Sequence, residues 1–116
     1  MKKPNLIVDK SFVFALSIIS LFKKLKEEKE HVLSKQLLRS GTSIGANVNE
    51  AISAESKKDF VHKLSISLKE ARESEYWLKL LNQSDLTKIN VTLHIEEAQR
   101  LIRILSSIII STKKNM

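Results

Sequence analysis

Two runs of polar side chains at helical spacing are the residues best placed to do chemistry. The first run begins beside Arg39 and advances in steps of three and four residues through Ser40, Ser43, Asn47 and Glu50. The second run supplies Glu70 and Glu73. Residues three and four apart share one face of a helix, so each run forms a stripe. Carboxylates gathered in such stripes could serve acid–base chemistry or hold a metal ion.

A hairpin of two helices that turns near Glu55 would bring the two stripes together. The pairs then expected are Arg39 with Glu70 or Glu73, and Glu50 with Lys57 or Lys63. Paired charges in a helical bundle more often fix packing and register than catalyse. We therefore favour an interhelical polar network over an active site, with these members: Arg39, Ser43, Asn47, Glu50, Glu70 and Glu73.

Other patterns that would indicate catalysis are weak. The run from Gly41 to Gly45 resembles a nucleophile elbow, but that motif requires a strand-to-helix turn, which an all-helical sequence does not supply. No Walker loop or dinucleotide fingerprint occurs. We expect His62 and His94 to be exposed rather than to ligate a metal. The sequence thus predicts no catalytic residue, no metal, no cofactor and no enzymatic activity.

A second group of residues could contact nucleic acid. Tyr76 and Trp77, with Arg72 and Lys79 nearby, could stack on bases, although we favour Trp77 as the seal of an interface between helices or subunits. The candidate phosphate contacts are dispersed lysines: Lys23, Lys24, Lys26, Lys57, Lys58, Lys63, Lys113 and Lys114. A symmetric oligomer could gather them into a basic ring, because every subunit contributes a copy.

The composition favours a cytoplasmic binding protein. Twenty Lys plus Arg against 13 Asp plus Glu give a formal net charge of +7, which favours polyanionic partners such as nucleic acid. The sequence has no cysteine, which suits a reducing cytoplasm. The apolar runs at residues 11–22 and 101–110 are too short to span a bilayer, so we expect no membrane partner. The length of 116 residues predicts one domain, residues 1–116.

The residue pattern is helical nearly throughout. Only two glycines and one proline occur, among abundant Leu, Ile, Lys, Glu and Ser. We predict four helices, over about residues 6–28, 31–53, 56–81 and 91–112. Ser56 should cap the third helix through Asp59, and residues 85–90 are ambiguous between a loop and a short helical turn. Short loops imply an all-α, antiparallel, up-down-up-down four-helix bundle.

Apolar residues at steps of three and four predict which faces form the core. For the second helix they are Leu33, Leu37, Gly41, Ile44, Val48 and Ala51. For the third they are Phe60, Leu64, Ser67, Ala71, Ser74, Leu78 and Leu81, and for the fourth Ile95, Ala98, Ile102, Leu105 and Ile109. The first helix has a stripe of Val8, Phe12, Ala15, Ile19 and Phe22, with further apolar residues around most of its circumference, namely Phe14, Leu16, Ile18 and Leu21.

Two features of these faces predict close packing and self-association. Gly41 and Gly45 each cost roughly 1 kcal/mol relative to alanine inside a helix, so they indicate either the close approach of another backbone or a bend. The first and fourth helices carry more apolar circumference than one bundle core can absorb. We therefore expect copies of the chain to associate through these two helices into a homo-oligomer.

The same residues resemble the 23S ribosomal RNA intervening-sequence proteins of bacteria. That family's pattern is approximately R-S-x-x-S-I-x-x-N-x-x-E-[GA], followed by K-D-F and E-x-x-E-x-x-x-W-L. It is met by Arg39, Ser40, Ser43, Ile44, Asn47, Glu50 and Ala51, and then by Lys58, Asp59, Phe60, Glu70, Glu73, Trp77 and Leu78. Ala51 stands where the family often has glycine.

The resemblance carries its own expectations about assembly and partners. It implies an antiparallel four-helix bundle that forms a ring, a homopentamer. The family is similar to the accessory variability protein of diversity-generating retroelements, a basic pentameric bundle that binds nucleic acid and a reverse transcriptase. We expect a non-enzymatic ring that binds RNA or DNA through backbone phosphates, with a role linked to rRNA intervening sequences. The alternative is a protein–protein adaptor or scaffold whose charge only solubilises it.

Overall fold

Four long helices account for most of the chain in the computed structural model, which describes the backbone of residues 2–116 and the side chains from residue 6 onward. The helices are α1 (Lys2–Glu27), α2 (Val32–Ile52), α3 (Lys57–Gln83) and α4 (Thr92–Lys114). No strand occurs among the described residues. The all-helical prediction is confirmed, and the predicted helix bounds lie within a few residues of the observed ones.

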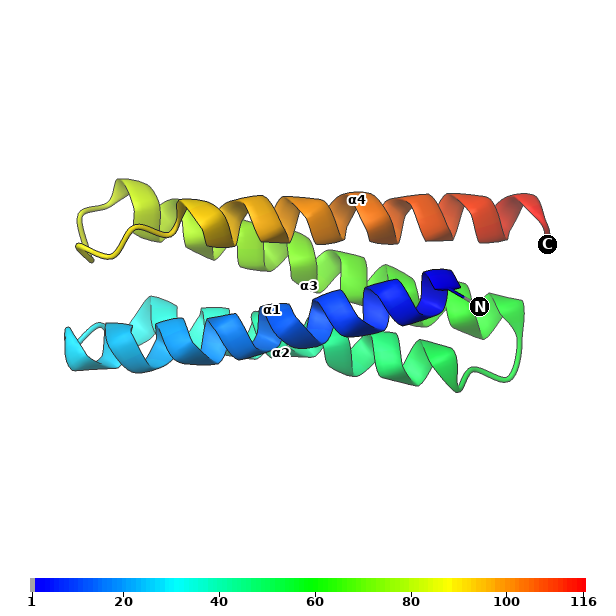
Figure 1. The fold of residues 1–116 in the computed structure, drawn as a ribbon, viewed down its shortest axis with the longest axis horizontal. Helices are drawn as coiled ribbons and strands as arrows, with labels where there is room; N and C mark the ends of the chain where they lie inside the picture. The colour runs from blue at the N-terminus through cyan, green and yellow to red at the C-terminus, as the bar shows by residue number, and fades with distance from the viewer. Residues whose placement is uncertain (1) are drawn as a thin grey trace.

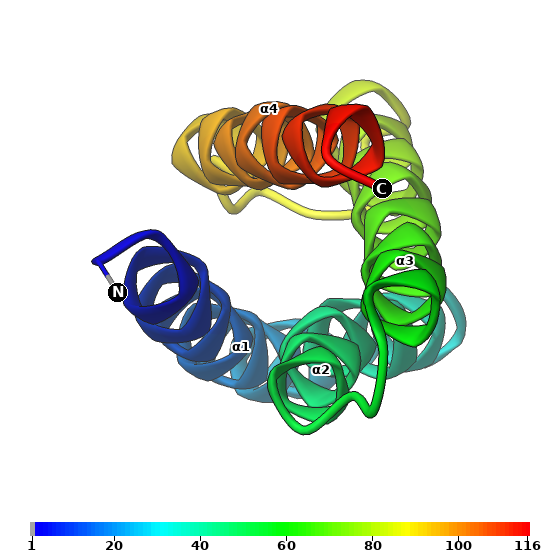
Figure 2. The ribbon, with the colours of Figure 1, turned by 90° about the vertical axis from the view of Figure 1, so that its right-hand side faces the viewer.

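The helices form a rod that is open along one side. Each helix packs against the next one in the chain, and α1 also contacts α4, but more sparsely than any other neighbouring pair. The rod measures 47 × 21 × 20 Å, and both chain ends lie at the same end of it (Figure 1). Viewed down the rod, the helices trace an arc whose two free edges are α1 and α4 (Figure 2).

Side chains cap the starts of α2 and α3. The Ser56 hydroxyl accepts a hydrogen bond from the backbone N–H of Asp59 at 3.0 Å, which is the predicted cap of α3. The Glu30 carboxylate accepts from the N–H groups of residues 32–34 at distances of 3.0, 3.1 and 2.7 Å. These hydrogen bonds satisfy three of the donors exposed at the start of α2, and the negative charge complements the positive end of the helix dipole.

Residues 85–90 form a loop rather than a helical turn. Asp85 has a positive φ of 61°, a left-handed backbone conformation in which the helical path ends. Thr87 fastens the loop, because its hydroxyl donates to the Glu28 carboxylate and accepts from the N–H of Ile89 at 3.0 Å. The loop alternative for this segment is therefore the correct one.

The predicted core faces of α2, α3 and α4 pack against one another. Every predicted position of α3 is buried except Phe60, which is half-buried beside the core residue Val61. In α2 the exception is Leu33, which is also half-buried. In α4 the core instead takes Leu101, while Ile95 and Ile102 are half-buried against it. Periodicity therefore located these faces to within one residue.

In α1 the most buried face lies beside the expected stripe, whose members Val8, Ala15, Ile19 and Phe22 are half-buried. The buried positions are Ile7, Ser11, Phe14, Ile18, Leu21 and Leu25. Phe12, a member of the expected stripe, is 61% exposed, and its neighbours Val13 and Leu16 are 63% and 52% exposed. We call Phe12, Val13 and Leu16 the outer α1 patch. It is an unusually large apolar surface for one helix to present to water.

The two glycines of α2 explain which face of α1 is buried. A Cβ atom at Gly41 would lie 3.0 Å from both γ carbons of Ile18, and one at Gly45 would lie 3.3 Å from the hydroxyl of Ser11. α2 runs unbroken through both positions, and neither glycine has a positive φ. Of the two interpretations of the glycines, close packing is correct and a bend is not. The space that they leave draws Ile18 and Ser11 into the core.

Candidate functional site

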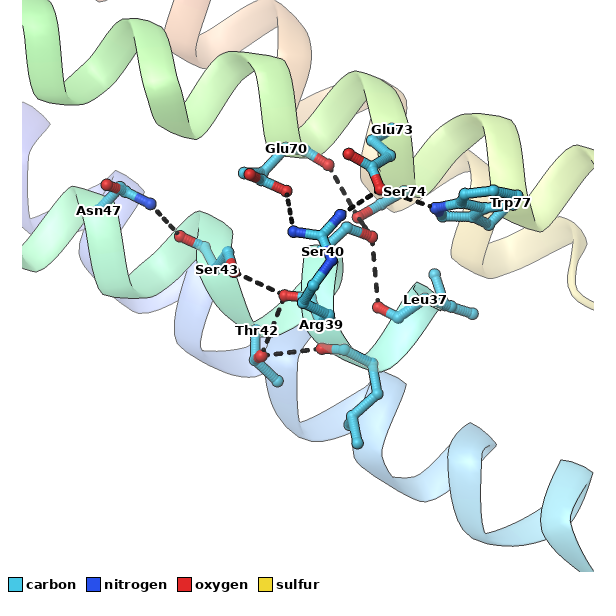
Figure 3. A network of polar contacts seen from close by, with 11 residues as sticks. Leu37, Arg39, Ser40, Thr42, Ser43, Asn47, Glu70, Glu73, Ser74 and Trp77 are labelled. Atoms are coloured by element: carbon cyan, nitrogen blue, oxygen red, sulfur yellow. Dashed lines mark hydrogen bonds and ion pairs between the residues drawn. The ribbon is translucent and has the colours of Figure 1, made fainter. Parts of the chain in front are cut away.

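The polar stripe of α2 lies against α3 and holds an ion-pair cluster (Figure 3). The Arg39 guanidinium donates to Glu70 Oε1 at 3.2 Å and, in a shorter contact, to Glu73 Oε2. Glu73 Oε2 also accepts from the indole Nε1 of Trp77 at 3.0 Å. Arg39 therefore pairs with both carboxylates that the hairpin register brought within its reach.

The other members of the stripe behave differently from Arg39. The Ser43 hydroxyl donates to the Arg39 carbonyl at 2.6 Å, and the Asn47 amide donates to the Ser43 carbonyl at 2.9 Å. Both hydrogen bonds stay within α2, one turn back along the helix. Glu50 does reach α3, where its carboxylate accepts from Lys63 Nζ at 3.0 Å. The predicted network is thus two separate interhelical clusters, joined by residues that bond to their own helix.

Charge stabilisation in the larger cluster works against acid–base chemistry. The hydrogen bond to Glu73 raises the pKa of Arg39 against partial desolvation, and the charge of Glu70 adds to this effect. Partial burial favours a higher pKa for Glu73, but hydrogen bonds from Arg39 and Trp77 outweigh it and hold that pKa below its ordinary value. A carboxylate kept ionised by two donors is a poor proton acceptor near neutral pH. The arrangement suits a clamp between helices.

This clamp fixes the register of α2 against α3 more than it adds to the free energy of unfolding. The Arg39 side chain is 51% exposed, and ion pairs at such positions typically contribute about 0–1 kcal/mol. The guanidinium nevertheless contacts two carboxylates one turn apart, so it favours a single register of α2 against α3.

Beneath the ion pairs lie buried hydroxyls whose joint role sequence reasoning missed. Ser40 Oγ and Ser74 Oγ are 2.8 Å apart, and both residues are fully buried. About two turns away along α3, the Ser67 hydroxyl donates to the Ile44 carbonyl at 2.8 Å. Such small side chains let α2 and α3 approach closely, and their hydrogen bonds offset the cost of burying them. The available signal was serine at two core positions of α3, Ser67 and Ser74, with Ser40 on the facing side of α2.

The two predicted aromatic residues have different surroundings. Trp77 is half-buried against the core, and its indole hydrogen bond to Glu73 ties it to the ion-pair cluster. Tyr76 is exposed and packs edge-on against Trp77, with ring centroids 5.3 Å apart. Trp77 therefore seals the α2–α3 cluster within one chain, whereas a role at a subunit interface or on a nucleic-acid base stays a prediction.

Seven of the eight candidate phosphate contacts fall into two groups at opposite ends of the rod. The α1-end lysines are Lys23, Lys24 and Lys26; the α3/α4-end lysines are Lys57, Lys58, Lys113 and Lys114. The second group is contiguous, because Lys57 Nζ donates to the Asn115 carbonyl of the α4 terminus at 3.1 Å. All seven are exposed, whereas Lys63 is partly covered and paired with Glu50. A single chain does not bring the two groups together.

The expectation that both histidines are exposed fails for His94. His62 is exposed, but His94 is half-buried, and its Nδ1 is shielded from solvent with no hydrogen-bond partner among the described residues. Burial lowers the pKa of His94, and the positive charge of Lys24 lowers it further. The physical reason is tertiary, since His94 is packed within the fold near enough to the end of α1 for the charge of Lys24 to act on it.

His94 should make stability depend on pH. Its pKa is lower in the folded than in the unfolded state, so its contribution to stability is fully present above the unfolded value of about 6.5 and is lost as pH falls through the folded value. We expect the urea midpoint to fall less between about pH 7.5 and pH 5 in His94→Gln than in the parent. His62→Gln is the matched control, and its urea midpoint should fall as much as that of the parent. Equal pH dependence of His94→Gln and the parent would contradict this assignment.

Neither a metal site nor a membrane-spanning helix is found in the described part of the chain. Within residues 2–116 no three His, Cys, Asp or Glu side chains are grouped so that they could hold a metal ion. In the same residues, none of the helices combines the length and the hydrophobicity needed to cross a bilayer.

Comparison with known proteins identifies relatives of uncharacterised function. The chain matches the family model described as 23S rRNA-intervening sequence protein over residues 3–107. It is 49% identical to a crystal structure from Bacteroides thetaiotaomicron VPI-5482, described as a protein with unknown function from the S23 ribosomal protein family. The two structures superpose with a TM-score of 0.87, over 92% of this chain and 97% of that one. No curated protein matches. The chain therefore belongs to the 23S rRNA-intervening sequence protein family.

Proposed function

We propose that this protein is a cytoplasmic, non-enzymatic helical bundle that assembles into a ring, a homopentamer, and binds RNA or DNA through backbone phosphates. Its role would be linked to the rRNA intervening sequences that give the family its description. The observation that carries the proposal is the placement of exposed lysines at the ends of the rod. A similarity to the accessory variability protein of retroelements is part of the same proposal.

A ring would concentrate these cations. In a ring of up-down-up-down rods that stand side by side, equivalent ends lie on the same rim, because cyclic symmetry relates every copy by a rotation about one axis. The four α3/α4-end lysines of each copy would then repeat around one rim and the α1-end lysines around the other. Charge that is modest on one protomer becomes a continuous basic band, which suits a polyanion.

The outer α1 patch supports the assembly step. Phe12, Val13 and Leu16 are each more than half exposed and adjacent on one helix, on the side of α1 that faces away from the core. The stretch around them has few cations, since the nearest lysines on either side are Lys10 and Lys23. Copies of a chain with a net charge of +7 repel each other least where cations are sparse and apolar surface is available.

Binding measured against salt concentration tests the nucleic-acid step. We expect affinity for structured RNA or duplex DNA to fall steeply as salt rises, with a slope of about −0.9 per duplex phosphate neutralised. The variant Lys57→Glu/Lys58→Glu should bind at least about tenfold more weakly and show a shallower slope. The matched control is Lys69→Glu/Arg100→Glu, which makes the same change in net charge on the side of the rod. Absence of binding by the parent at low salt, or equal losses in both variants, would overturn the proposal.

A protein–protein adaptor is the second candidate, and the outer α1 patch is the observation that favours it. The same apolar surface that could join copies of this chain could receive a different protein. A pull-down before and after nuclease treatment separates the two functions. Partners that are lost after nuclease treatment support nucleic-acid binding. Partners that stay bound after nuclease treatment, but that the Phe12→Glu variant no longer captures, support the adaptor.

A further inference from the structure

An apolar groove lies between the free edges of the arc and is lined by residues of all four helices. It has a volume of about 470 Å³ and lies near the end of the rod at which α1 begins and α4 finishes. Its walls are apolar: Ile7 and Leu64 are buried beneath it, and Phe60, Ile104 and Ile108 are half-buried along it. The volume falls within the range of roughly 300–1,000 Å³ that is usual for small-molecule sites.

The polar part of the lining comes from α4. Arg103, Ser107 and Ser111 follow one another at intervals of four residues, so they form a line along one edge of the groove. All three are exposed, and Arg103 has no ion-pair partner among the described side chains. By contrast, Arg100 pairs with Glu97 at 3.4 Å and does not line the groove. No carboxylate side chain lines it either.

We propose that this groove binds a free, single-chain aliphatic carboxylate, with the chain in the groove and the headgroup at Arg103. Burial of methylene groups against aliphatic walls supplies affinity, and a charge-assisted hydrogen bond from the guanidinium orients the headgroup. The hydroxyls of Ser107 and Ser111 offer further donors along the same edge. This site is independent of nucleic-acid binding, and nothing in the family description assigns it.

The charge of the lining favours a small anion over a second copy of the chain. Arg103 places a positive charge on the edge of the groove and no carboxylate side chain lines it, whereas a second copy would bring a further net charge of +7. A carboxylate on an aliphatic chain matches both the cation and the apolar walls.

Calorimetric titration of the full chain with decanoate, kept below its micelle-forming concentration, tests this site. We expect decanoate to bind at least about tenfold more tightly than hexanoate, because each further buried methylene contributes up to about fourfold. Arg103→Gln should weaken decanoate about tenfold and leave the uncharged 1-decanol unchanged, since only the carboxylate meets the guanidinium. Arg100→Gln is the matched control and should alter neither ligand. Ser107→Trp should block both ligands while the helical circular-dichroism spectrum is retained.

Several results would overturn the proposal. One is equal weakening of decanoate by Arg103→Gln and Arg100→Gln, which would show general charge attraction. Another is uptake of decanoate that Ser107→Trp does not change, which would show adsorption elsewhere. Uptake only when the oligomer dissociates would assign the groove to a second copy of the chain. Binding to phosphatidylcholine vesicles without uptake of free decanoate would assign it to a lipid surface.

Discussion

Phe12→Glu/Leu16→Glu should convert the proposed oligomer into a folded monomer. Both side chains are more than half exposed in the single chain, so the substitutions leave the core intact. In the proposed ring both would be buried, and each large apolar side chain removed from water contributes about 1.5–3 kcal/mol. Unpaired carboxylates placed in such an interface add a desolvation cost of several kcal/mol. Light scattering coupled to size-exclusion chromatography at micromolar concentration measures the change.

A matched variant shows whether the position of these residues matters. Val32 and Leu86 are 72% and 51% exposed, and they lie at the start of α2 and in the loop before α4, away from the outer α1 patch. Val32→Glu/Leu86→Glu makes the same change in charge and should leave the proposed oligomer intact. A parent protein that is already monomeric at micromolar concentration would remove the ring from the proposal. Dissociation by both variants would place the interface elsewhere or make it diffuse.

The sequence predicted best the features that depend on local chemistry and short loops. Scarce glycine and proline fixed the helical class, and the alternating steps from Leu64 to Leu81 fixed the core face of α3. The short connection between α2 and α3 constrained their register, so the pairing of Arg39 with Glu70 and Glu73 could be foreseen. These predictions needed only the local sequence and the short loop between two consecutive helices.

Features that depend on packing between helices were not predictable in the same way. A helix that is apolar nearly all round carries no contrast by which one face can be chosen, so the buried face of α1 followed from the glycines of α2 instead. The burial of His94 depends on where α1 ends over α4. The groove beside Arg103 exists because α1 and α4 barely meet, and no local pattern encodes that gap.

The division of the lysines between two ends also required the fold. Lys58 and Lys113 are 55 positions apart in the chain, yet they belong to one end of the rod because α3 starts where α4 finishes. The sequence alone allowed only a statement that the candidate contacts were dispersed. The positions of the helices show which lysines lie together, and they therefore support a proposal about which surface binds phosphate.

Gly41→Ala should destabilise the fold, although alanine is the better helix former. The exchange gains up to about 1 kcal/mol of helix propensity. The new methyl group would lie 3.0 Å from both γ carbons of Ile18, a fully buried and β-branched side chain that has little freedom to move. Overpacking of this kind costs about 1–3 kcal/mol, so we expect a net loss of roughly 1–2 kcal/mol in the free energy of unfolding from urea titrations.

Gly45→Ala is the matched control. Comparison of the two variants tests whether the close approach of α1 explains why glycine occupies positions 41 and 45. The nearest atom to a Cβ at Gly45 is the Ser11 hydroxyl at 3.3 Å, which can rotate away, so the gain in propensity should prevail and stability should stay level or rise by up to about 1 kcal/mol. In an Ile18→Ala background the cost of Gly41→Ala should become much smaller, because the two γ carbons 3.0 Å from the new methyl group are gone and only the Cβ of residue 18, at 3.3 Å, remains near it. If Gly41→Ala and Gly45→Ala stabilised the protein equally, contact with Ile18 would not be what opposes alanine at position 41. A cost of Gly41→Ala that is undiminished in the Ile18→Ala background would mean that its origin is not the contact with those γ carbons.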